Sequence, residues 1–138
     1  TITNYDYTVL RSVCWNLLKK ITSTTNKEII LNVGEKCFHN WYIVIEHKYY
    51  YIEYYKSLLM YTRWLYVQGA YKECIRYTNK YIKFSIDSTS EMQILKEQIG
   101  YLWLRASSKK NVLSNEYESR VEYFKNLFPN CNRDLSKR

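Results

Sequence analysis

The stretch WLYVQGAYKECIRYTNKYIKF, which runs from Trp64 to Phe84, decides the fold. It places one glycine, Gly69, between two runs of aromatic and aliphatic residues. Glycine readily adopts the left-handed conformation that ends a helix, because it has no Cβ to clash with the backbone. The stretch therefore predicts a helix that ends at Val67, a turn at Gly69 and a second helix from Ala70 to Phe84.

The same periodicity extends outward from this hairpin in both directions. Apolar residues recur at spacings of three and four residues, which is the pattern of a helix with one face on a core. The pattern predicts about six helices, over residues 6–21, 27 into the forties, 50–67, 70–84, 92–106 and 114–128. The polar runs TSTTN, DSTSE and SSKKN, at 22–26, 87–91 and 107–111, separate neighbouring helices.

Composition supports an all-α class. The chain has 138 residues, 46% of them hydrophobic, with only three glycines and one proline. A chain of this size buries roughly two thirds of its unfolded surface, enough for one core, and so few turn-forming residues disfavour a many-stranded sheet. We expect a single all-α domain at 1–128, built of antiparallel helical hairpins, and a polar, flexible tail at 129–138.

The net charge and the aromatic content indicate which classes of partner suit the chain, but they do not select one class. The net charge of +8 attracts acidic proteins, nucleic acid and anionic membranes alike. Sixteen tyrosines add side chains with an apolar body and a polar tip, suited to a core or to a wet groove. An AT-rich genome explains this tyrosine content as well as selection for binding does.

The cysteines favour a reducing intracellular compartment. Cys14, Cys37, Cys74 and Cys131 are far apart and form no CxxC pair. The sequence predicts buried free thiols, although a disulfide stays open as an alternative. No run of about 20 apolar residues is present, so we expect no membrane-spanning helix. These features suit the cytoplasm or the cytosolic face of an organelle.

The stretch LLMYTRWLYVQGAYKECIRYTNKYIKF, residues 58–84, resembles a tetratricopeptide repeat, a helical hairpin that recurs at about 34 residues. Its strongest part is GAYKECI, where Gly69, Tyr71, Cys74 and Ile75 match the turn glycine, the aromatic, the small and the aliphatic residue of that family. Upstream, the large apolar positions are matched by Leu58, Tyr61 and Leu65, with Thr62 as the small residue between them. Downstream the pattern departs, with Tyr81 in the place of a small alanine. The resemblance implies an interaction scaffold.

The order of segments is also similar to the cytosolic domain of the mitochondrial fission adaptors, the Fis proteins. VCWNLLKK is followed by a helix, then by MYTRWLYVQGAYKECIRYTNKYI, a linker and EMQILKEQI. The resemblance implies a six-helix bundle of two tetratricopeptide-like units. Those adaptors continue into a C-terminal membrane anchor, whereas this chain has the polar stretch YESRVEYFKNLFPNCNRDLSKR at its end.

The sequence carries no pattern typical of an enzyme, and we expect no cofactor. Cys37, His39 and His47 are the only candidate metal ligands, and Cys37 and His39 lie on different sides of a helix. The acidic cluster of Glu116, Glu118 and Glu122 suits a solvated helix face better than paired catalytic carboxylates. A phosphate loop, a nucleophile elbow and a dinucleotide fingerprint are all absent.

A groove on the first helix of the hairpin is the leading candidate site. In repeats of this type, first helices line the concave face, and the resemblance places five residues there: Lys56, Leu59, Arg63, Tyr66 and Val67. Two cations beside apolar groups suit a protein or peptide partner with acidic and hydrophobic residues. The open alternative is that Leu59 and Tyr66 pack against the neighbouring hairpin.

Two other functions stay open. The second helix of the hairpin carries a basic stripe that suits phosphate backbones, with tyrosines nearby to stack bases: Lys72, Arg76, Lys80 and Lys83. A solvated helix face explains the same stripe. The tyrosine-rich surface also suits a structural subunit of a larger assembly or a homo-oligomer. The sequence favours a non-enzymatic adaptor over both.

Overall fold

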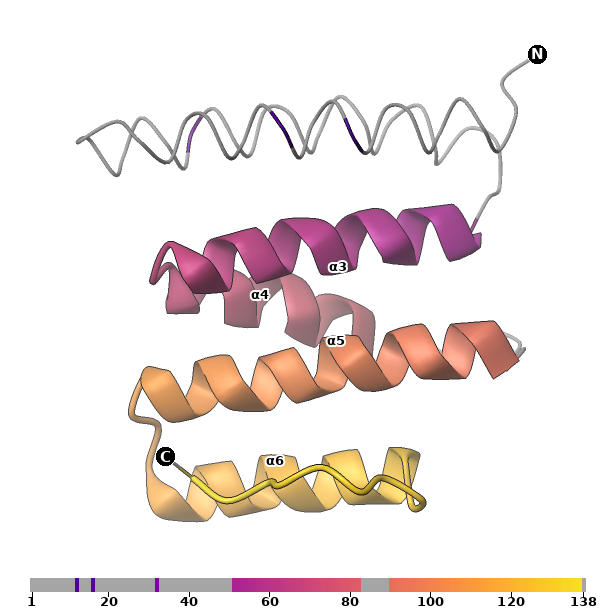
Figure 1. Ribbon diagram of the computed structural model, residues 1–138. Helices are drawn as coiled ribbons and strands as arrows, with labels where there is room; N and C mark the ends of the chain where they lie inside the picture. The colour runs from indigo at the N-terminus through magenta and orange to yellow at the C-terminus, as the bar shows by residue number, and fades with distance from the viewer. Residues whose placement is uncertain (1–11, 13–15, 17–31, 33–50, 83–89, 138) are drawn as a thin grey trace. The chain divides into compact units, whose positions relative to one another are not determined.

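The structure is a computed structural model that describes residues 12, 16, 32, 51–82 and 90–137. Four helices are described in full: α3 at Tyr51–Val67, α4 at Tyr71–Ile82, α5 at Ser90–Lys109 and α6 at Ser114–Leu127 (Figure 1). No strand occurs among the described residues. The predicted all-α class is therefore confirmed for this part of the chain. Apart from residues 12, 16 and 32, which are helical, the predicted helices over 6–21 and 27 into the forties lie outside it.

Two compact units make up the chain, residues 1–64 and 65–138, and each is described by itself. In the first unit, most of the α3 side chains whose burial is described, between Tyr55 and Trp64, are buried, with Leu58 and Tyr61 among the core residues. The buried Thr62 hydroxyl donates to the Leu58 carbonyl at 2.8 Å, so its polar group is satisfied within the helix. The single domain predicted over 1–128 stays a prediction.

The turn at Gly69 ends α3 by the predicted mechanism. Gly69 has a φ of 75°, in the left-handed region. Its N–H donates to the Tyr66 carbonyl at 3.0 Å, and the Ala70 N–H donates to the Leu65 carbonyl at 2.9 Å. These two bonds form a Schellman motif, which satisfies carbonyls that the helix end would leave open. The expected left-handed cap glycine is confirmed.

The core of the second unit lies where α4, α5 and α6 meet. α5 packs against both α4 and α6, and the buried cluster consists of Ile82, Trp103, Leu104, Tyr117 and Phe124. Gly100 explains how closely the three helices approach. A Cβ on Gly100 would lie 2.8 Å from Ile82 Cδ1 and 2.9 Å from the Phe124 ring, so the contact has room only for hydrogen.

α5 is longer than the sequence predicts. The polar run SSKKN at 107–111 suggests a loop, but Ser107, Ser108 and Lys109 belong to the helix. Ser107 and Ser108 are buried, and the Ser107 hydroxyl donates to the Trp103 carbonyl at 2.8 Å. The hydroxyl thus finds its partner inside the helix, which makes serine compatible with a buried helical position. The helix ends at Lys109, and Asn111, two residues later, has a φ of 60°.

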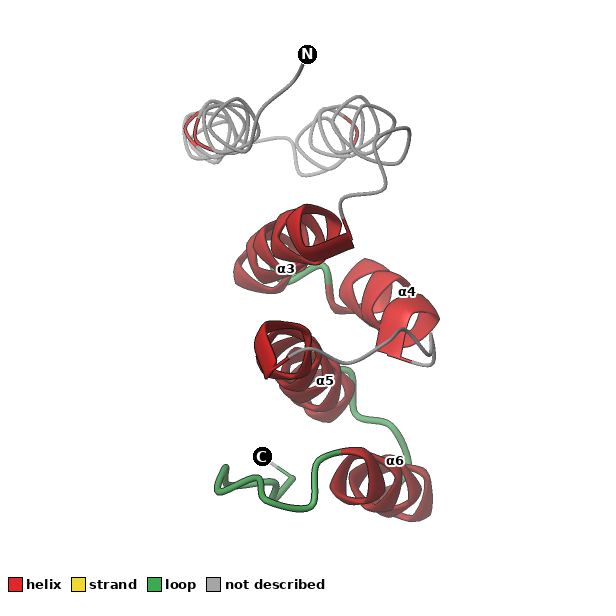
Figure 2. Cartoon of the chain, turned by 90° about the vertical axis from the view of Figure 1, so that its right-hand side faces the viewer, coloured by secondary structure: helices red, strands yellow, loops and turns green. Residues whose placement is uncertain are grey.

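Residues 128–137, called the C-terminal segment below, return along α5 and α6 without regular secondary structure. In Figure 2, α4 and α6 lie on one side of this unit, and α5 and the C-terminal segment lie on the other. The segment therefore occupies the place that the next helix of an alternating stack would take. The sequence predicts a polar, flexible tail from residue 129, and the structure gives that tail defined contacts.

Candidate functional site

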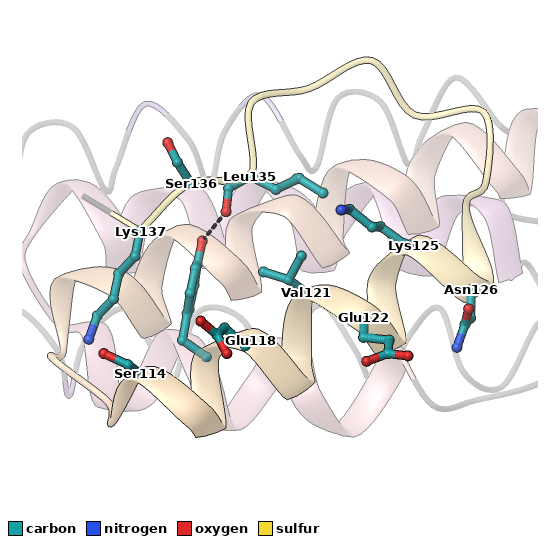
Figure 3. Close-up of a pocket in the computed structure, with 10 residues that line it drawn as sticks. Ser114, Glu118, Val121, Glu122, Lys125, Asn126, Leu135, Ser136 and Lys137 are labelled. Carbon is teal, nitrogen blue, oxygen red and sulfur yellow. Dashed lines mark hydrogen bonds between the residues drawn. The ribbon is translucent and has the colours of Figure 1, made fainter.

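Side chains of α5 and α6 hold the C-terminal segment by its backbone. The Tyr117 hydroxyl donates to the Leu135 carbonyl at 2.9 Å (Figure 3). Arg105 Nη2 donates to the next carbonyl, that of Ser136, at 2.7 Å, and also to the Tyr117 oxygen. Two successive carbonyls of one segment are thus bound by two side chains that also bind each other.

Arg105 lies among aromatic rings. Its guanidinium carbon is 5.4 Å from the centre of the Tyr101 ring, a cation–π contact. Burial raises the pKa of Tyr66, and the Arg105 charge is close enough to offset part of that rise. Tyr117 is buried, which raises its pKa as well, again partly offset by Arg105. Arg105 thus contacts Tyr101 on α5 and Tyr117 on α6, and its charge acts on Tyr66 at the end of α3. We call these four residues the Arg105 cluster.

Further contacts fix the register of the C-terminal segment. Arg133 Nε donates to Glu97 Oε1 at 3.2 Å, and its guanidinium lies 4.7 Å from the centre of the same Tyr101 ring. Asp134 Oδ1 accepts from the Ser136 N–H at 3.0 Å, which turns the chain between the two carbonyl contacts. Leu135 is half-buried against the core cluster.

The C-terminal segment fills its place incompletely. Between it and α6 lie two open grooves of about 660 Å³ and about 600 Å³. Val121, Lys125, Leu135 and Ser136 line both grooves, and Glu118 and Glu122 line the larger one. In Figure 3, Val121 and Lys125 point from α6 toward the segment. Both grooves are open to solvent, so they leave room for larger side chains than those of the C-terminal segment.

The five residues of the predicted groove divide between the two units. In the first unit, Leu59 is buried with 5% of its surface exposed, Lys56 is half-buried and Arg63 is exposed. In the second unit, Val67 is exposed and Tyr66 belongs to the Arg105 cluster. Tyr66 also makes an edge contact with Tyr71, with ring centres 5.4 Å apart. A partner at the five positions stays a prediction.

The predicted basic stripe lies on a solvent-exposed face of α4. Lys72, Arg76 and Lys80 are exposed and follow one another at four-residue spacing, so they share a face of the helix. Arg76 lies 4.9 Å from the centre of the Tyr77 ring. Lys83 lies outside the described residues.

The described part of the chain contains neither a candidate metal site nor a candidate membrane-spanning helix. No group of three or more histidine, cysteine, aspartate or glutamate side chains is placed to hold a metal ion there, and Cys37, His39 and His47 lie outside it. Cys74 is a buried free thiol, as predicted, and Cys131 is a half-buried one. None of the four helices between Tyr51 and Leu127 has the length and apolar content needed to cross a bilayer.

Comparisons of the chain with protein-family models, with curated proteins and with solved structures find no match. The residues that hold the C-terminal segment were not predicted from the sequence. Arg105 stands within an amphipathic helix pattern and Ser136 within a polar run, and neither has a local signal. Only the fold brings the two together across 31 positions of the chain.

Proposed function

We propose that this protein is a non-enzymatic interaction module that binds a short segment of a partner across α5 and α6. In the structure its own C-terminal segment occupies that place. One observation carries the proposal: Tyr117 and Arg105 bind the carbonyls of Leu135 and Ser136. Backbone contacts of this kind supply affinity for a bound segment, and a side-chain anchor supplies specificity.

The arrangement of the second unit supports an interaction scaffold of helical hairpins. The Gly69 turn joins α3 to α4, and α4, α5, α6 and the C-terminal segment alternate between two sides (Figure 2). In a stack of this kind each element covers the face of the one before it, so the last face accepts an additional element. A tetratricopeptide-like architecture with about six helices, and kinship with fission adaptors, belong to this proposal.

Binding of a free peptide to a chain with a weakened C-terminal segment tests the proposal. A labelled peptide of residues 128–137 is titrated by fluorescence anisotropy into the full-length native chain and a full-length Leu135→Ser variant. The variant should bind at least about tenfold more tightly, because the native segment must leave before the peptide can enter.

A matched control uses another leucine of the same region. Leu127 is exposed at the end of α6 and lines neither groove, so a Leu127→Ser chain should bind the peptide as the native chain does. A peptide that binds neither the native nor the Leu135→Ser chain would overturn the proposal. A circular dichroism spectrum of each variant establishes that it is folded.

Binding of nucleic acid by α4 is the second candidate function. It rests on the shared exposed face of Lys72, Arg76 and Lys80. Affinity for a single-stranded oligonucleotide should then fall with salt, by a log–log slope of about −0.7 for each phosphate contacted. Replacing the three cations by glutamine should remove that binding while leaving peptide binding at α5 and α6 unchanged.

A further inference from the structure

The charge of Arg105 is only partly compensated where it lies. Among the described residues its guanidinium contacts the Tyr117 hydroxyl, the Ser136 carbonyl and the Tyr101 ring, all of them neutral. Its Nε atom is buried and has no hydrogen-bond partner. The ion pairs described in this unit join other arginines, Arg120 to Glu116 and Arg133 to Glu97. Arg105 is half-buried, and a partly desolvated guanidinium is stabilised when a carboxylate pairs with it.

A carboxylate would suit Arg105 better than the carbonyl that it now binds. A guanidinium and a carboxylate form a pair of opposite charges, often with two parallel hydrogen bonds, which is stronger than a hydrogen bond to a neutral carbonyl. The site has an acceptor in place, the Ser136 carbonyl at 2.7 Å. The Cα of residue 136 is bonded to that carbonyl carbon, so position 136 is next to the guanidinium. In the chain's own segment the Ser136 hydroxyl donates to Asp134 Oδ1 at 2.8 Å, and an acidic side chain at this position must turn away from Asp134 toward Arg105.

The other end of the site has the opposite charge. Glu97 lies eight residues before Arg105 on α5, about 12 Å along the helix, and it pairs with Arg133 of the C-terminal segment. An occupant therefore meets a carboxylate at one end and a cation at the other. Glu118 and Glu122 on α6 line the larger groove, so an occupant that is acidic along its whole length would be repelled.

We propose that the partner segment carries a basic residue, an aliphatic residue two positions later and a glutamate or aspartate directly after that. The basic residue pairs with Glu97, the aliphatic residue takes the place of Leu135, and the carboxylate pairs with Arg105. The chain's own segment matches the first two positions and has Ser136 at the third. This inference rests on the proposed function, and it makes the C-terminal segment a weaker competitor of the partner.

Two peptides that differ by one charge provide the test. Both span residues 128–137 and carry Asp134→Asn, which removes the carboxylate beside position 136. One has Ser136→Glu and the other Ser136→Gln, and both are titrated into the full-length Leu135→Ser chain. The glutamate peptide should bind about tenfold more tightly at low salt, the difference expected between a charged and a neutral acceptor. The difference should shrink as salt is raised and vanish in a chain that also carries Arg105→Gln.

The outcomes separate this inference from the proposed function. Equal binding of the two peptides would leave the proposed function standing and overturn the acidic preference. Binding of neither would overturn both.

A second measurement does not depend on the Arg105→Gln chain being folded. Hydrogen exchange of the C-terminal segment is compared between full-length Ser136→Glu and Ser136→Gln chains that both carry Asp134→Asn, so that no carboxylate lies beside position 136. The glutamate chain should exchange about tenfold more slowly at residues 133–137, because its segment is held by the charge pair. Equal exchange would contradict the inference.

Discussion

At the scale of single residues, two left-handed positions end two helices by the same motif. Gly69 ends α3, and Asn111, with φ 60°, ends α5. The Asn111 N–H donates to the Ser108 carbonyl at 3.2 Å, the bond that Gly69 makes with Tyr66. Glycine adopts this conformation freely, asparagine tolerates it, and other residues with a Cβ are strained in it. Gly69 was predictable because glycine is rare in this chain, whereas Asn111 stands in a run of polar residues.

Replacing Gly69 by alanine should therefore destabilise the protein. We expect Gly69→Ala to lower the free energy of unfolding by about 1–2 kcal/mol, since alanine must adopt a positive φ. Gly69→Asn should lose less, because Asn111 already fills the equivalent position in α5. Urea unfolding of the three chains measures the order. An alanine variant as stable as the native chain would show that the turn does not require a left-handed residue.

At the scale of elements, α6 begins without a capping side chain. Its N-cap is Leu113, which has a non-helical φ and ψ of −57° and 147° and makes no side-chain hydrogen bond to the helix. The side chain is 71% exposed, so little packing would be lost by replacing it. The Glu116 N–H, one of those at the helix start, already donates to Asn115 Oδ1 at 2.9 Å. A capping oxygen at position 113 would satisfy another.

The variant Leu113→Ser should thus stabilise α6. We expect the free energy of unfolding to rise by about 0.5–1 kcal/mol. This is the lower part of the usual range for an N-cap side chain, because Asn115 already accepts a hydrogen bond from the Glu116 N–H. Leu113→Ala is the matched control, since it removes the exposed leucine without adding an oxygen. Thermal unfolding followed by circular dichroism compares the two. A serine chain no more stable than the alanine chain would rule out the missing cap as a source of instability.

At the scale of the whole molecule, the second unit buries groups that ionise only at high pH. Burial raises the pKa of the Cys74 thiol from an ordinary value of 9.0 to about 12. The pKa values of Tyr66 and Tyr117 are raised as well, chiefly by burial. All three groups are neutral in the folded protein at neutral pH. A group with a raised folded pKa contributes stability below its unfolded pKa and loses it as pH rises toward the folded value.

Stability should consequently fall as the pH is raised above 9. Between pH 9 and 10 the main contribution comes from Cys74, and it approaches about 1.4 kcal/mol per pH unit as the unfolded thiol ionises. Above pH 10 the two tyrosines add to the loss, and ionised Tyr117 can no longer donate to the Leu135 carbonyl. Urea unfolding at pH 8, 9, 10 and 11 measures this dependence. A Cys74→Ala chain should be flatter between pH 9 and 10, and an equally steep profile would assign the loss to other groups.

The amino-acid sequence by itself determined the helical class, the end of α3 at Val67 and the Gly69 turn. These features depend on spacing within one helix and on the backbone freedom of one residue type, which are local properties. The extent of α5 was missed because Ser107 and Ser108 are buried in the helix, and the Ser107 hydroxyl donates to the Trp103 carbonyl. Only the tertiary structure decided where the C-terminal segment lies. Its contacts join Arg105 and Tyr117 to backbone carbonyls of Ser136 and Leu135, and because every residue has a carbonyl, such partners leave no trace in the sequence.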